Sequence, residues 1–256
     1  MLNFPNTSRL FLLVLIFSIV MDYYVGLSDF IYLSIFLLYS TIFFYGVFNI
    51  EANFFVPSIC SKATTNKICA LSFDDGPSHY TLEILQILKR HKIPAAFFCI
   101  GKAIETHESV FQQIHLQGHL IGNHSYSHHL LFDFFARQTM FNDLKRMDTI
   151  MVKLIGLRPK LFRPPFGVTN PQLNWAISQS DYTSVGWSVR SLDTVISDEK
   201  KLLSKVSASL KPGAIFLFHD TQKITLAILP EFIEYVLANG YQIIRLDKML
   251  NLSPYK

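Results

Sequence analysis

The sequence predicts an α/β protein in which two transmembrane helices precede a domain built on a parallel sheet. Two observations lead to this prediction. The apolar residues gather at the front of the chain, and the remainder alternates short apolar runs with longer amphipathic segments. With 256 residues, half of them hydrophobic and 16% charged, the chain can bury one sizeable core. We expect a membrane anchor over residues 1–50, a linker over 51–66 and a folded domain over 67–256.

The anchor is predicted from the near absence of charge. Between residues 10 and 50 the only charged residues are Asp22 and Asp29, and the uncharged run 30–50 is as long as a spanning helix needs. The shorter run 10–25 crosses as well if Asp22 is tolerated. A cleaved signal peptide is disfavoured because "MDYYVGLSD" lacks a small-residue cleavage pattern and a longer apolar run follows at once. A buried helix pair is disfavoured by the length of the second run.

The domain is predicted from strand-like runs separated by helical patterns such as residues 78–91 and 225–240. Since these runs are apolar throughout, we expect them to be buried on both faces, as in a closed or nearly closed barrel with a helical coat. The seven candidate strands are "ICALSF", "AAFFCI", "HLIGN", "LFRPP", "YTSVGWS", "GAIFLFH" and "YQIIRL".

Charge and cysteine content exclude some classes of protein. The net charge of +4 is small and the Lys and Arg residues are scattered, which argues against a nucleic-acid surface. Three cysteines without a CxxC pair indicate no disulfide framework: Cys69 and Cys99 fall in apolar runs and are expected to be buried thiols, whereas Cys60 falls in the linker, outside the expected core. The absence of a GxSxG sequence disfavours a serine hydrolase.

Ionisable side chains follow five of the candidate strands. Because the carboxyl ends of parallel strands meet at one edge, we expect these side chains to lie close together and to carry the chemistry. They are Asp74 and Asp75 after the first strand, His124 and His128 after the third, Arg163 after the fourth, Asp193 after the fifth, and His219 and Asp220 at the end of the sixth.

Two adjacent carboxylates, Asp74 and Asp75, repel each other unless a cation or a proton lies between them. His124 and His128 are four residues apart, a spacing that places both imidazoles on one face of a helical turn. Two histidines and one of the aspartates would bind a divalent metal and leave one coordination position open, as in catalytic zinc sites. Zinc is the metal we expect, although cobalt and manganese fit the same ligands.

The motifs "SFDDGP", "HSYSH", "RPPFG" and "LFHD", in this order, resemble the signature of the polysaccharide deacetylase family, carbohydrate esterase family 4, which shares the nodulation-type deacetylase homology domain. The resemblance covers roughly residues 67–250. It implies a distorted (β/α)7 barrel as the catalytic domain over 67–256. It also implies a metal-dependent hydrolase that removes N-acetyl or related acyl groups from amino sugars in a polysaccharide or a lipid-linked glycan. The alternatives are a catalytically silent carbohydrate-binding relative and a membrane protein that only recruits partners.

The resemblance also implies a role for each residue that matches a family motif. The metal ligands would be Asp75, His124 and His128. The catalytic set would be Asp74 as general base, Arg163 as its orienting partner, His219 as general acid and Asp193 as the support of that histidine.

The substrate contacts would be the backbone N–H of Phe166 and the apolar side chain of Leu217. Thr194 stands where the family commonly places a groove-lining tryptophan. Trp187, predicted within the fifth strand, is therefore either a third substrate-binding candidate or a plain core residue. Two residues remain open: Arg190 pairs with Asp193 or reaches an anionic substrate group, and Asp220 is a loop hydrogen-bonder or a functional residue.

The side of the membrane is the least determined feature. Arg9 precedes the first apolar run and Lys62 and Lys67 follow the second, while the turn between them has only acidic neighbours. The positive-inside rule therefore predicts a multi-pass membrane protein whose domain faces the cytoplasm, which favours lipid-linked sugars over a finished wall polymer. The family resemblance points the other way, since many members act on cell walls.

Overall fold

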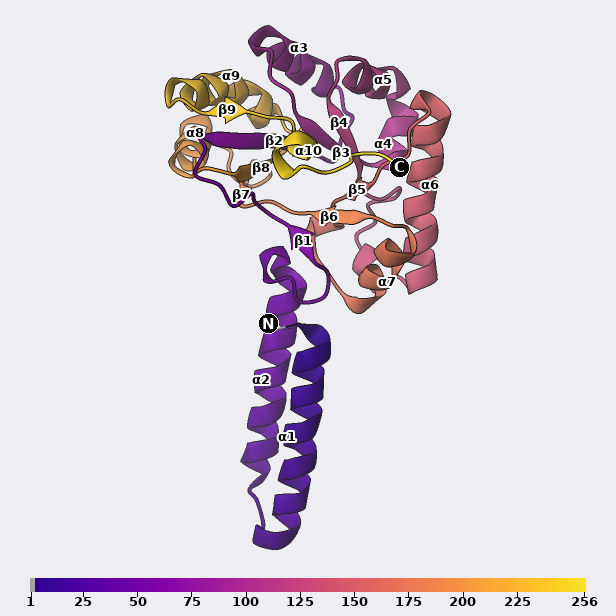
Figure 1. Cartoon of the computed structure of the whole chain (residues 1–256), viewed down its shortest axis with the longest axis vertical. Helices are drawn as coiled ribbons and strands as arrows, with labels where there is room; N and C mark the ends of the chain where they lie inside the picture. The colour runs from indigo at the N-terminus through magenta and orange to yellow at the C-terminus, as the bar shows by residue number, and fades with distance from the viewer. Residues whose placement is uncertain (1–2) are drawn as a thin grey trace.

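The computed structural model describes residues 3–256 and consists of a helical hairpin that projects from a compact domain (Figure 1). The hairpin is formed by α1 (Phe4–Val25) and α2 (Asp29–Phe48). Its turn depends on Asp22, whose carboxylate accepts hydrogen bonds from Leu27 N at 2.6 Å and from the Tyr32 hydroxyl at 3.1 Å. Only 6% of the most apolar window of each helix is buried inside the molecule, so both helices expose apolar side chains almost all around.

The domain contains one parallel sheet whose strands lie in the order β1-β6-β5-β4-β3-β2-β8-β7, with β9 pairing the start of β2. Across residues 3–256 the end strands β1 and β7 do not pair with each other, so the barrel is incomplete. This confirms the predicted distorted (β/α) barrel. The strands are β1 (Ser58–Ile59), β2 (Ile68–Asp74), β3 (Ala96–Cys99), β4 (Leu120–Asn123), β5 (Leu161–Phe162), β6 (Thr183–Val185), β7 (Val189–Arg190), β8 (Ala214–His219) and β9 (Gln242–Ile243).

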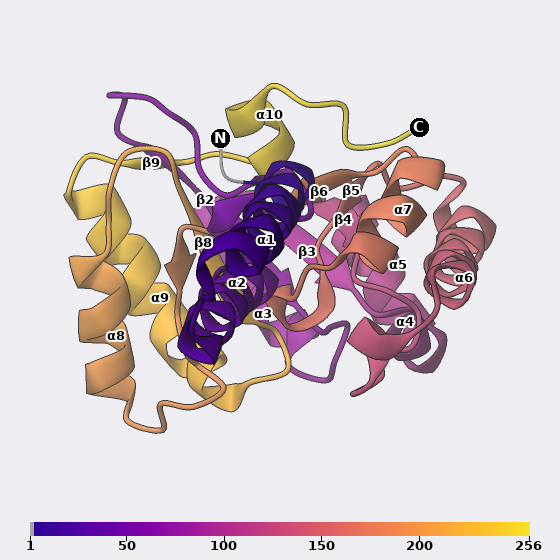
Figure 2. The same cartoon turned by 90° about the horizontal axis from the view of Figure 1, so that it is seen from below.

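All seven candidate strands are present, and β1 and β7 are additional. Each of these two has only two residues and, unlike the equally short β5 and β9, neither stands out from its surroundings as an apolar run. Helices surround the sheet when it is viewed along the hairpin (Figure 2). They are α3 (Thr81–His91), α4 (Gly101–Thr106), α5 (Glu108–Leu116), α6 (Arg137–Ile155), α7 (Pro171–Gln179), α8 (Glu199–Ala208), α9 (Lys223–Ala238) and α10 (Leu246–Leu250), with 3-10 turns at Ile50–Ala52, Phe132–Phe134 and Pro165–Gly167.

Strand β2 lies at the centre of the sheet and is buried on both faces, as its apolar run predicts. Its side chains alternate: Leu71 and Phe73 belong to the cluster shared with the outer helices, whereas Ala70 belongs to the cluster inside the barrel. The same alternation turns Ser72 and Asp74 toward the interior. The last inward-facing residue of β2 is therefore a carboxylate at the carboxyl edge of the sheet.

Residues 51–66, expected as a linker, pack closely on the domain. Phe54, Phe55 and Val56 are buried in one apolar cluster with Phe43 and Val47 of α2 as partly buried neighbours. β1 follows directly and pairs with β6. Apolar contacts thus hold the hairpin against the domain.

Cys60 also differs from expectation, because it is half-buried. Its Sγ atom packs closely against Gly186, since a Cβ on that residue would lie only 2.6 Å from the sulfur. Burial raises the pKa of the Cys60 thiol to about 11, so little of the reactive thiolate is present at neutral pH.

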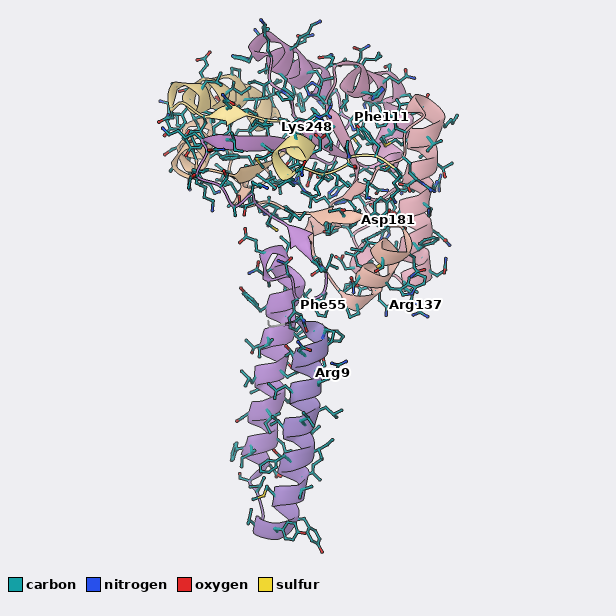
Figure 3. All side chains as sticks on the ribbon, in the orientation of Figure 1. Arg9, Phe55, Phe111, Arg137, Asp181 and Lys248 are labelled. Atoms are coloured by element: carbon teal, nitrogen blue, oxygen red, sulfur yellow. The ribbon has the colours of Figure 1, made fainter. Side chains whose placement is uncertain are left out.

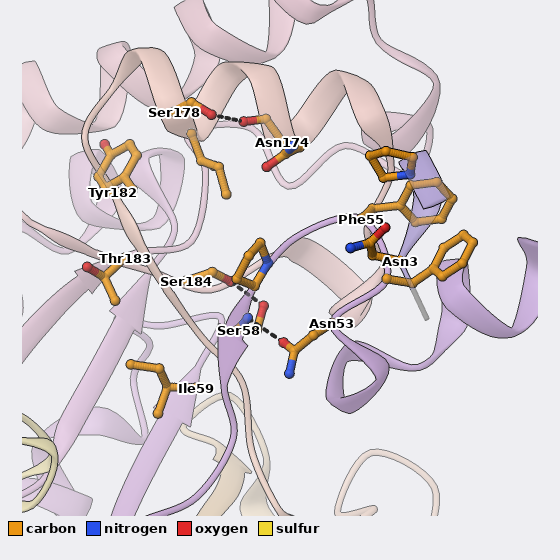
Figure 4. A pocket seen from close by; sticks show the side chains of 14 residues that line it. Asn3, Asn53, Phe55, Ser58, Ile59, Asn174, Ser178, Tyr182, Thr183 and Ser184 are labelled. Carbon is orange, nitrogen blue, oxygen red and sulfur yellow. Dashed lines mark hydrogen bonds between the residues drawn. The ribbon is translucent and has the colours of Figure 1, made fainter. Parts of the chain in front are cut away.

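A cavity of about 760 Å³ lies at the junction of the hairpin and the domain (Figure 4). Hydrogen bonds join Ser58 Oγ to Ser184 Oγ at 2.7 Å and the Ser58 N–H to Asn53 Oδ1 at 2.6 Å. Among the residues that the structure describes, no acid, histidine, lysine, arginine or cysteine lines this cavity. The described lining therefore holds none of the carboxylate, imidazole or thiolate groups that commonly bind a catalytic metal.

Candidate active site

Asp74 and Asp75 stand at the carboxyl end of β2 and line one small cavity. Asp75 has a φ of 74°, a left-handed conformation that residues other than glycine seldom adopt. Gly76 follows, and a Cβ there would lie 2.0 Å from Asp220 Oδ2, so no larger residue fits.

Asp75 is brought together with His124 and His128, as the sequence predicted. Asp75 Oδ1 lies 3.5 Å from His124 Nε2 and 3.4 Å from His128 Nε2. These separations match the roughly 3.4 Å edge of a tetrahedron of N and O ligands about 2.1 Å from zinc. Within residues 3–256, Asp75 Oδ1 is buried without a hydrogen-bond partner, which is expected of an atom placed to bind a cation. The three residues therefore fit a divalent metal.

The reason why the two histidines meet differs from our prediction. The residues after β4 form an irregular loop, not a helical turn, with Ser125 at a φ of 68° and His128 at a φ of 41°. The His128 N–H donates to Ser125 Oγ at 2.9 Å, and Asp143 of α6 accepts from the Tyr126 N–H at 2.7 Å. One hydrogen bond within the motif and one from α6 thus hold the loop.

The orientation and charge of the histidines also suit metal binding. His124 Nδ1 lies 2.8 Å from the backbone oxygen of Arg163, so Nδ1 carries the proton and Nε2 faces Asp75. Burial and then the charge of His124 lower the pKa of His128 to about 4, which leaves its lone pair free at neutral pH.

The neighbouring pKa values show a site rich in negative charge. Burial lowers the pKa of His124, but Asp74 and Asp75 raise it overall. Burial raises the pKa of Asp75, but the surrounding imidazoles, first of all His124, hold it below its usual range. A cation between these groups would take the place of the proton on His124.

Arg163 is fully buried behind the cavity and holds Asp74. Its Nη1 atom donates to Asp74 Oδ1 at 2.7 Å and to Ser72 Oγ at 2.8 Å, while Nε and Nη2 donate to the carbonyls of Val185 and Gly186. Burial lowers the pKa of Arg163, and the charge of Asp74 opposes this shift. The other carboxylate oxygen, Asp74 Oδ2, lies 3.8 Å from His124 Nε2 and faces the cavity.

His219 and Asp193 form a second buried pair. Asp193 Oδ1 lies 2.8 Å from His219 Nδ1, and Oδ2 accepts from the His219 backbone N–H at 2.7 Å and from Thr225 Oγ1 at 2.5 Å. This arrangement turns His219 Nε2 toward the cavity, 4.0 Å from Asp75 Oδ2. Burial lowers the pKa of His219, but Asp193, followed by the two aspartates of β2, raises it overall to about 9.

The cavity has a volume of about 220 Å³. Phe166, Leu217 and Trp187 line it together with both aspartates of β2, His124, His128 and His219. Phe166 has a φ of 57°, and its ring makes an edge contact with His128 at a centroid distance of 4.6 Å. Leu217 lies two residues before His219 on β8, so both side chains face the same way.

Trp187 does not lie within the fifth predicted strand but in the segment between β6 and β7. Arg190 and Thr194 also line the cavity, and Arg190 makes no ion pair with any described residue, including Asp193. Its predicted pairing with Asp193 is therefore absent, because Asp193 is occupied by His219 and Thr225.

Several supporting residues were not predicted. Thr225 and Thr81 lie outside the motifs, and Ser72 begins "SFDDGP" without a role assigned from the sequence, so only their contacts reveal them. Thr81 Oγ1 donates to Asp220 Oδ2 at 2.6 Å, and Asp220 is fully buried below the turn at Gly76. Burial raises the pKa of Asp220 to about 7. Asp220 thus acts as a loop hydrogen-bonder.

Comparison with known proteins agrees with this geometry. The family model described as polysaccharide deacetylase matches residues 61–185. The crystal structure of the Bc1960 peptidoglycan N-acetylglucosamine deacetylase is 30% identical with a TM-score of 0.73, and the match covers 78% of this chain and 95% of that one. The chain belongs to the polysaccharide deacetylase family. The family consists of carbohydrate esterases that hydrolyse N-acetyl amide bonds.

Two further relatives show the range of the polysaccharide deacetylase family. The peptidoglycan-N-acetylglucosamine deacetylase PgdA of Listeria monocytogenes is 32% identical over 195 residues, which are 76% of this chain but 41% of PgdA. The chain thus matches less than half of that relative's length. BA3943 of Bacillus anthracis, a family 4 pseudoenzyme, is 22% identical with a TM-score of 0.71 over 76% of this chain, a likeness of fold alone.

Proposed function

We propose that this protein is a membrane-anchored, metal-dependent hydrolase that removes N-acetyl or related acyl groups from amino sugars in a glycan. The observation that carries the proposal is that Asp74, held by Arg163, and His219, held by Asp193, line the same cavity as Asp75. A base, an acid and a metal-ligand set within one cavity are what amide hydrolysis needs.

Asp74 is proposed as the general base. Its Oδ1 is held by Arg163, which leaves Oδ2 to accept a proton from the attacking water. The fixed guanidinium holds the carboxylate in one orientation, so no reorganisation is needed during the reaction.

Asp75, His124 and His128 are proposed to hold a divalent ion, most simply zinc. When bound, the ion supplies Lewis acidity to the substrate carbonyl and lowers the pKa of a nearby water toward ~7. The three ligands bind through nitrogen and oxygen atoms, and zinc, cobalt and manganese all accept such ligands.

His219 is proposed as the general acid. Expulsion of a sugar amine requires a proton on nitrogen, and His219 Nε2 faces the cavity while Nδ1 is held by Asp193. The overall reaction adds one water to the amide and yields one carboxylic acid and one amine. The Phe166 N–H would stabilise the developing oxyanion, and Leu217 would contact the acyl methyl group.

The hairpin is proposed to cross the membrane twice. Its helices are 22 and 20 residues long and expose apolar side chains, and each is long enough for the ~30 Å hydrocarbon core. The contact of α2 with the domain, where the Thr169 N–H donates to the Val47 carbonyl at 3.1 Å, supports a permanent anchor over a cleaved signal sequence.

The test uses the full chain, purified in detergent or vesicles and loaded with zinc. It is incubated with N-acetylglucosamine oligomers and with a lipid-linked N-acetyl sugar, and released acetate and free amine are measured. We expect equal amounts of both, and none from the Asp74→Asn variant at equal metal content. At full metal occupancy, acetate release no higher than that of Asp74→Asn with every substrate would contradict the proposal. The silent carbohydrate-binding alternative predicts this second outcome, and the intact acid and base argue against it.

A further inference from the structure

We propose that the loop between β4 and α6 contacts the bilayer surface through Leu130, Leu131 and Phe134, and that this contact holds the neighbouring metal-ligand candidate His128 near the membrane. These three residues are called the apolar loop below. The inference rests on the proposed membrane anchoring and adds a second contact with lipid, made by the domain itself.

The first observation is exposure. Leu130 is 83% and Phe134 85% exposed, more than any other large apolar side chain within residues 49–256. Leu131 between them is 56% exposed, whereas Phe132 is fully buried and anchors the segment. Leaving a Leu or Phe side chain in water forgoes roughly 1.5–3 kcal/mol of burial free energy. Three such side chains in one short loop indicate a surface that another apolar phase covers.

The second observation is position. Phe132 belongs to the same apolar cluster as Phe54 and Phe55, against which α2 packs. Asn170 Nδ2 donates to the Asp133 carbonyl at 2.9 Å, and the adjacent Thr169 N–H donates to Val47 in the last turn of α2. The apolar loop is thus connected to the domain end of the hairpin by two consecutive contacts.

The length of the hairpin places one bilayer surface at the end of the hairpin that joins the domain. At about 1.5 Å per residue, the 22 residues of α1 span roughly 33 Å, close to the ~30 Å hydrocarbon thickness. Tyr23 and Tyr24 are exposed at the far end, and tyrosine is enriched at membrane–water interfaces. The near boundary then falls at Phe4, whose ring packs against those of Phe54 and Phe55 at 6.2 and 5.0 Å. The base of the domain meets the bilayer there.

The chemistry beside the apolar loop suits lipid rather than a protein partner. Arg137 begins α6 directly after the loop, and its guanidinium lies 4.9 Å from the ring of Trp175. Figure 3 shows Arg137 on the side of the domain from which the hairpin projects, as is Phe55. Exposed leucine and phenylalanine beside tryptophan and arginine are typical of segments that lie in the interface and meet anionic headgroups. The hairpin brings this surface to the bilayer, so lipid is the occupant we infer.

The apolar loop is also close in the chain to the candidate active site. The loop continues from the metal-ligand candidate His128, whose ring touches the half-exposed Phe166 on the cavity wall. A lipid contact of the apolar loop therefore keeps His128, two residues before Leu130, close to acetylated sugars that are presented at the bilayer surface.

The test measures lipid contact directly. One exposed cysteine at a time, Phe134→Cys or Leu116→Cys, is introduced into the full chain with Cys60→Ala, and the buried Cys69 and Cys99 remain. The introduced cysteine is labelled with an environment-sensitive fluorophore. Leu116 is the matched control, because it is an apolar residue 72% exposed at the end of α5, on the side opposite the hairpin (Figure 1). After reconstitution into anionic phospholipid vesicles, quenching by lipids with a shallow nitroxide is compared. We expect at least twofold stronger quenching and a blue-shifted emission for the label at Phe134.

A third label, Phe36→Cys in the middle of α2, reports on anchoring through a deep nitroxide, since Phe36 is 60% exposed. If this label is quenched while the Phe134 label behaves like the Leu116 label, the bilayer contact is overturned and anchoring stands. If the Phe36 label is not quenched, anchoring fails and the inference fails with it. Acetate release measured in the same vesicles tests the hydrolase proposal separately.

Discussion

Arg163 Nη1 lies 2.7 Å from Asp74 Oδ1, and both side chains are buried behind the cavity. Two further guanidinium nitrogens bond to backbone carbonyls, so the arginine is fixed in three directions. Asp74 therefore depends on a partner whose planar geometry lysine does not reproduce.

The first prediction is that Arg163→Lys loses both activity and stability. A lysine leaves backbone carbonyls unpaired, and breaking a buried ion pair costs about 3–5 kcal/mol. We expect kcat to fall by about 100-fold or more and the free energy of unfolding in urea to fall by several kcal/mol. The control is Arg90→Lys, an exposed arginine in the last turn of α3, whose change should alter stability by about 0.5 kcal/mol at most. A normal kcat in folded Arg163→Lys would remove the ion pair from the mechanism.

The second prediction separates the two aspartates of β2. Asp75→Ala and His124→Ala should lose bound metal, because each removes one of three ligands. Asp74→Asn should keep the metal and lose turnover, because only the proton acceptor is removed. Metal content is measured by elemental analysis. His129→Ala is the matched control and should retain metal, since His129 is an exposed histidine outside the cluster. A folded Asp74→Asn variant without metal would show that the roles of the aspartates are exchanged.

The third prediction concerns the pH profile. His219 must be protonated to donate, so activity falls as the pH rises through its pKa, which its surroundings raise to about 9. A divalent cation bound at Asp75 would offset the negative charge by which Asp75 helps to raise the pKa of His219. The basic limb of the metal-loaded enzyme should therefore lie below pH 9. Asp193 makes the largest contribution that raises the pKa of His219. The basic limb of the Asp193→Asn variant should therefore lie at lower pH than that of the wild type. The ratio kcat/KM is measured from pH 6 to 10, and coincident basic limbs would exclude His219 as the acid.

The fourth prediction concerns stability in acid. His119 is buried, and its Nδ1 accepts a hydrogen bond from the Ala95 N–H at 3.1 Å, which requires the neutral ring. Burial lowers the pKa of His119 from 6.5 to about 4. The unfolded chain thus binds more protons between these pH values, so stability is full above about 6.5 and falls as the pH drops toward 4. The loss amounts to about 3 kcal/mol.

His119→Gln keeps an acceptor without a titrating ring, so it should be less pH-dependent than the wild type in this window. Urea unfolding at pH 7, 5.5 and 4.5 measures the difference between the two proteins, which cancels the carboxylates common to both. Parallel pH curves would show that His119 is not responsible.

The fifth prediction is the topology of the hairpin. Arg9 lies at the domain end of α1, and the distant turn carries only the acidic residues Asp22 and Asp29, so the positive-inside rule predicts that the domain faces the cytoplasm. Cys60 is a poor probe because its thiol is half-buried with a raised pKa. Leu116→Cys is an exposed replacement. A membrane-impermeant maleimide should label it only in permeabilised cells. Labelling in intact cells would place the domain outside and make a wall polymer the preferred substrate.

The sequence by itself determined the features that depend on local pattern. The apolar runs of the hairpin and seven of the nine strands within residues 3–256 follow from composition and periodicity alone. The strand-end residues follow from a topological rule: in a parallel sheet all carboxyl ends lie at one edge, so the residues after each strand must meet. For this reason Asp74, Asp75, His124, His128, Arg163, Asp193 and His219 were found without coordinates.

Tertiary structure alone decided the features that depend on contacts distant in the sequence. The loop at His128 is held by Asp143 of α6, Asp193 is held by Thr225 of α9, and Arg163 is held by Ser72 of β2. Residues 51–66 pack on the domain because Phe54 and Phe55 find apolar partners on α2. No periodic pattern records such pairs, since a hydrogen bond or an apolar contact depends on position in space and leaves no fixed spacing along the chain.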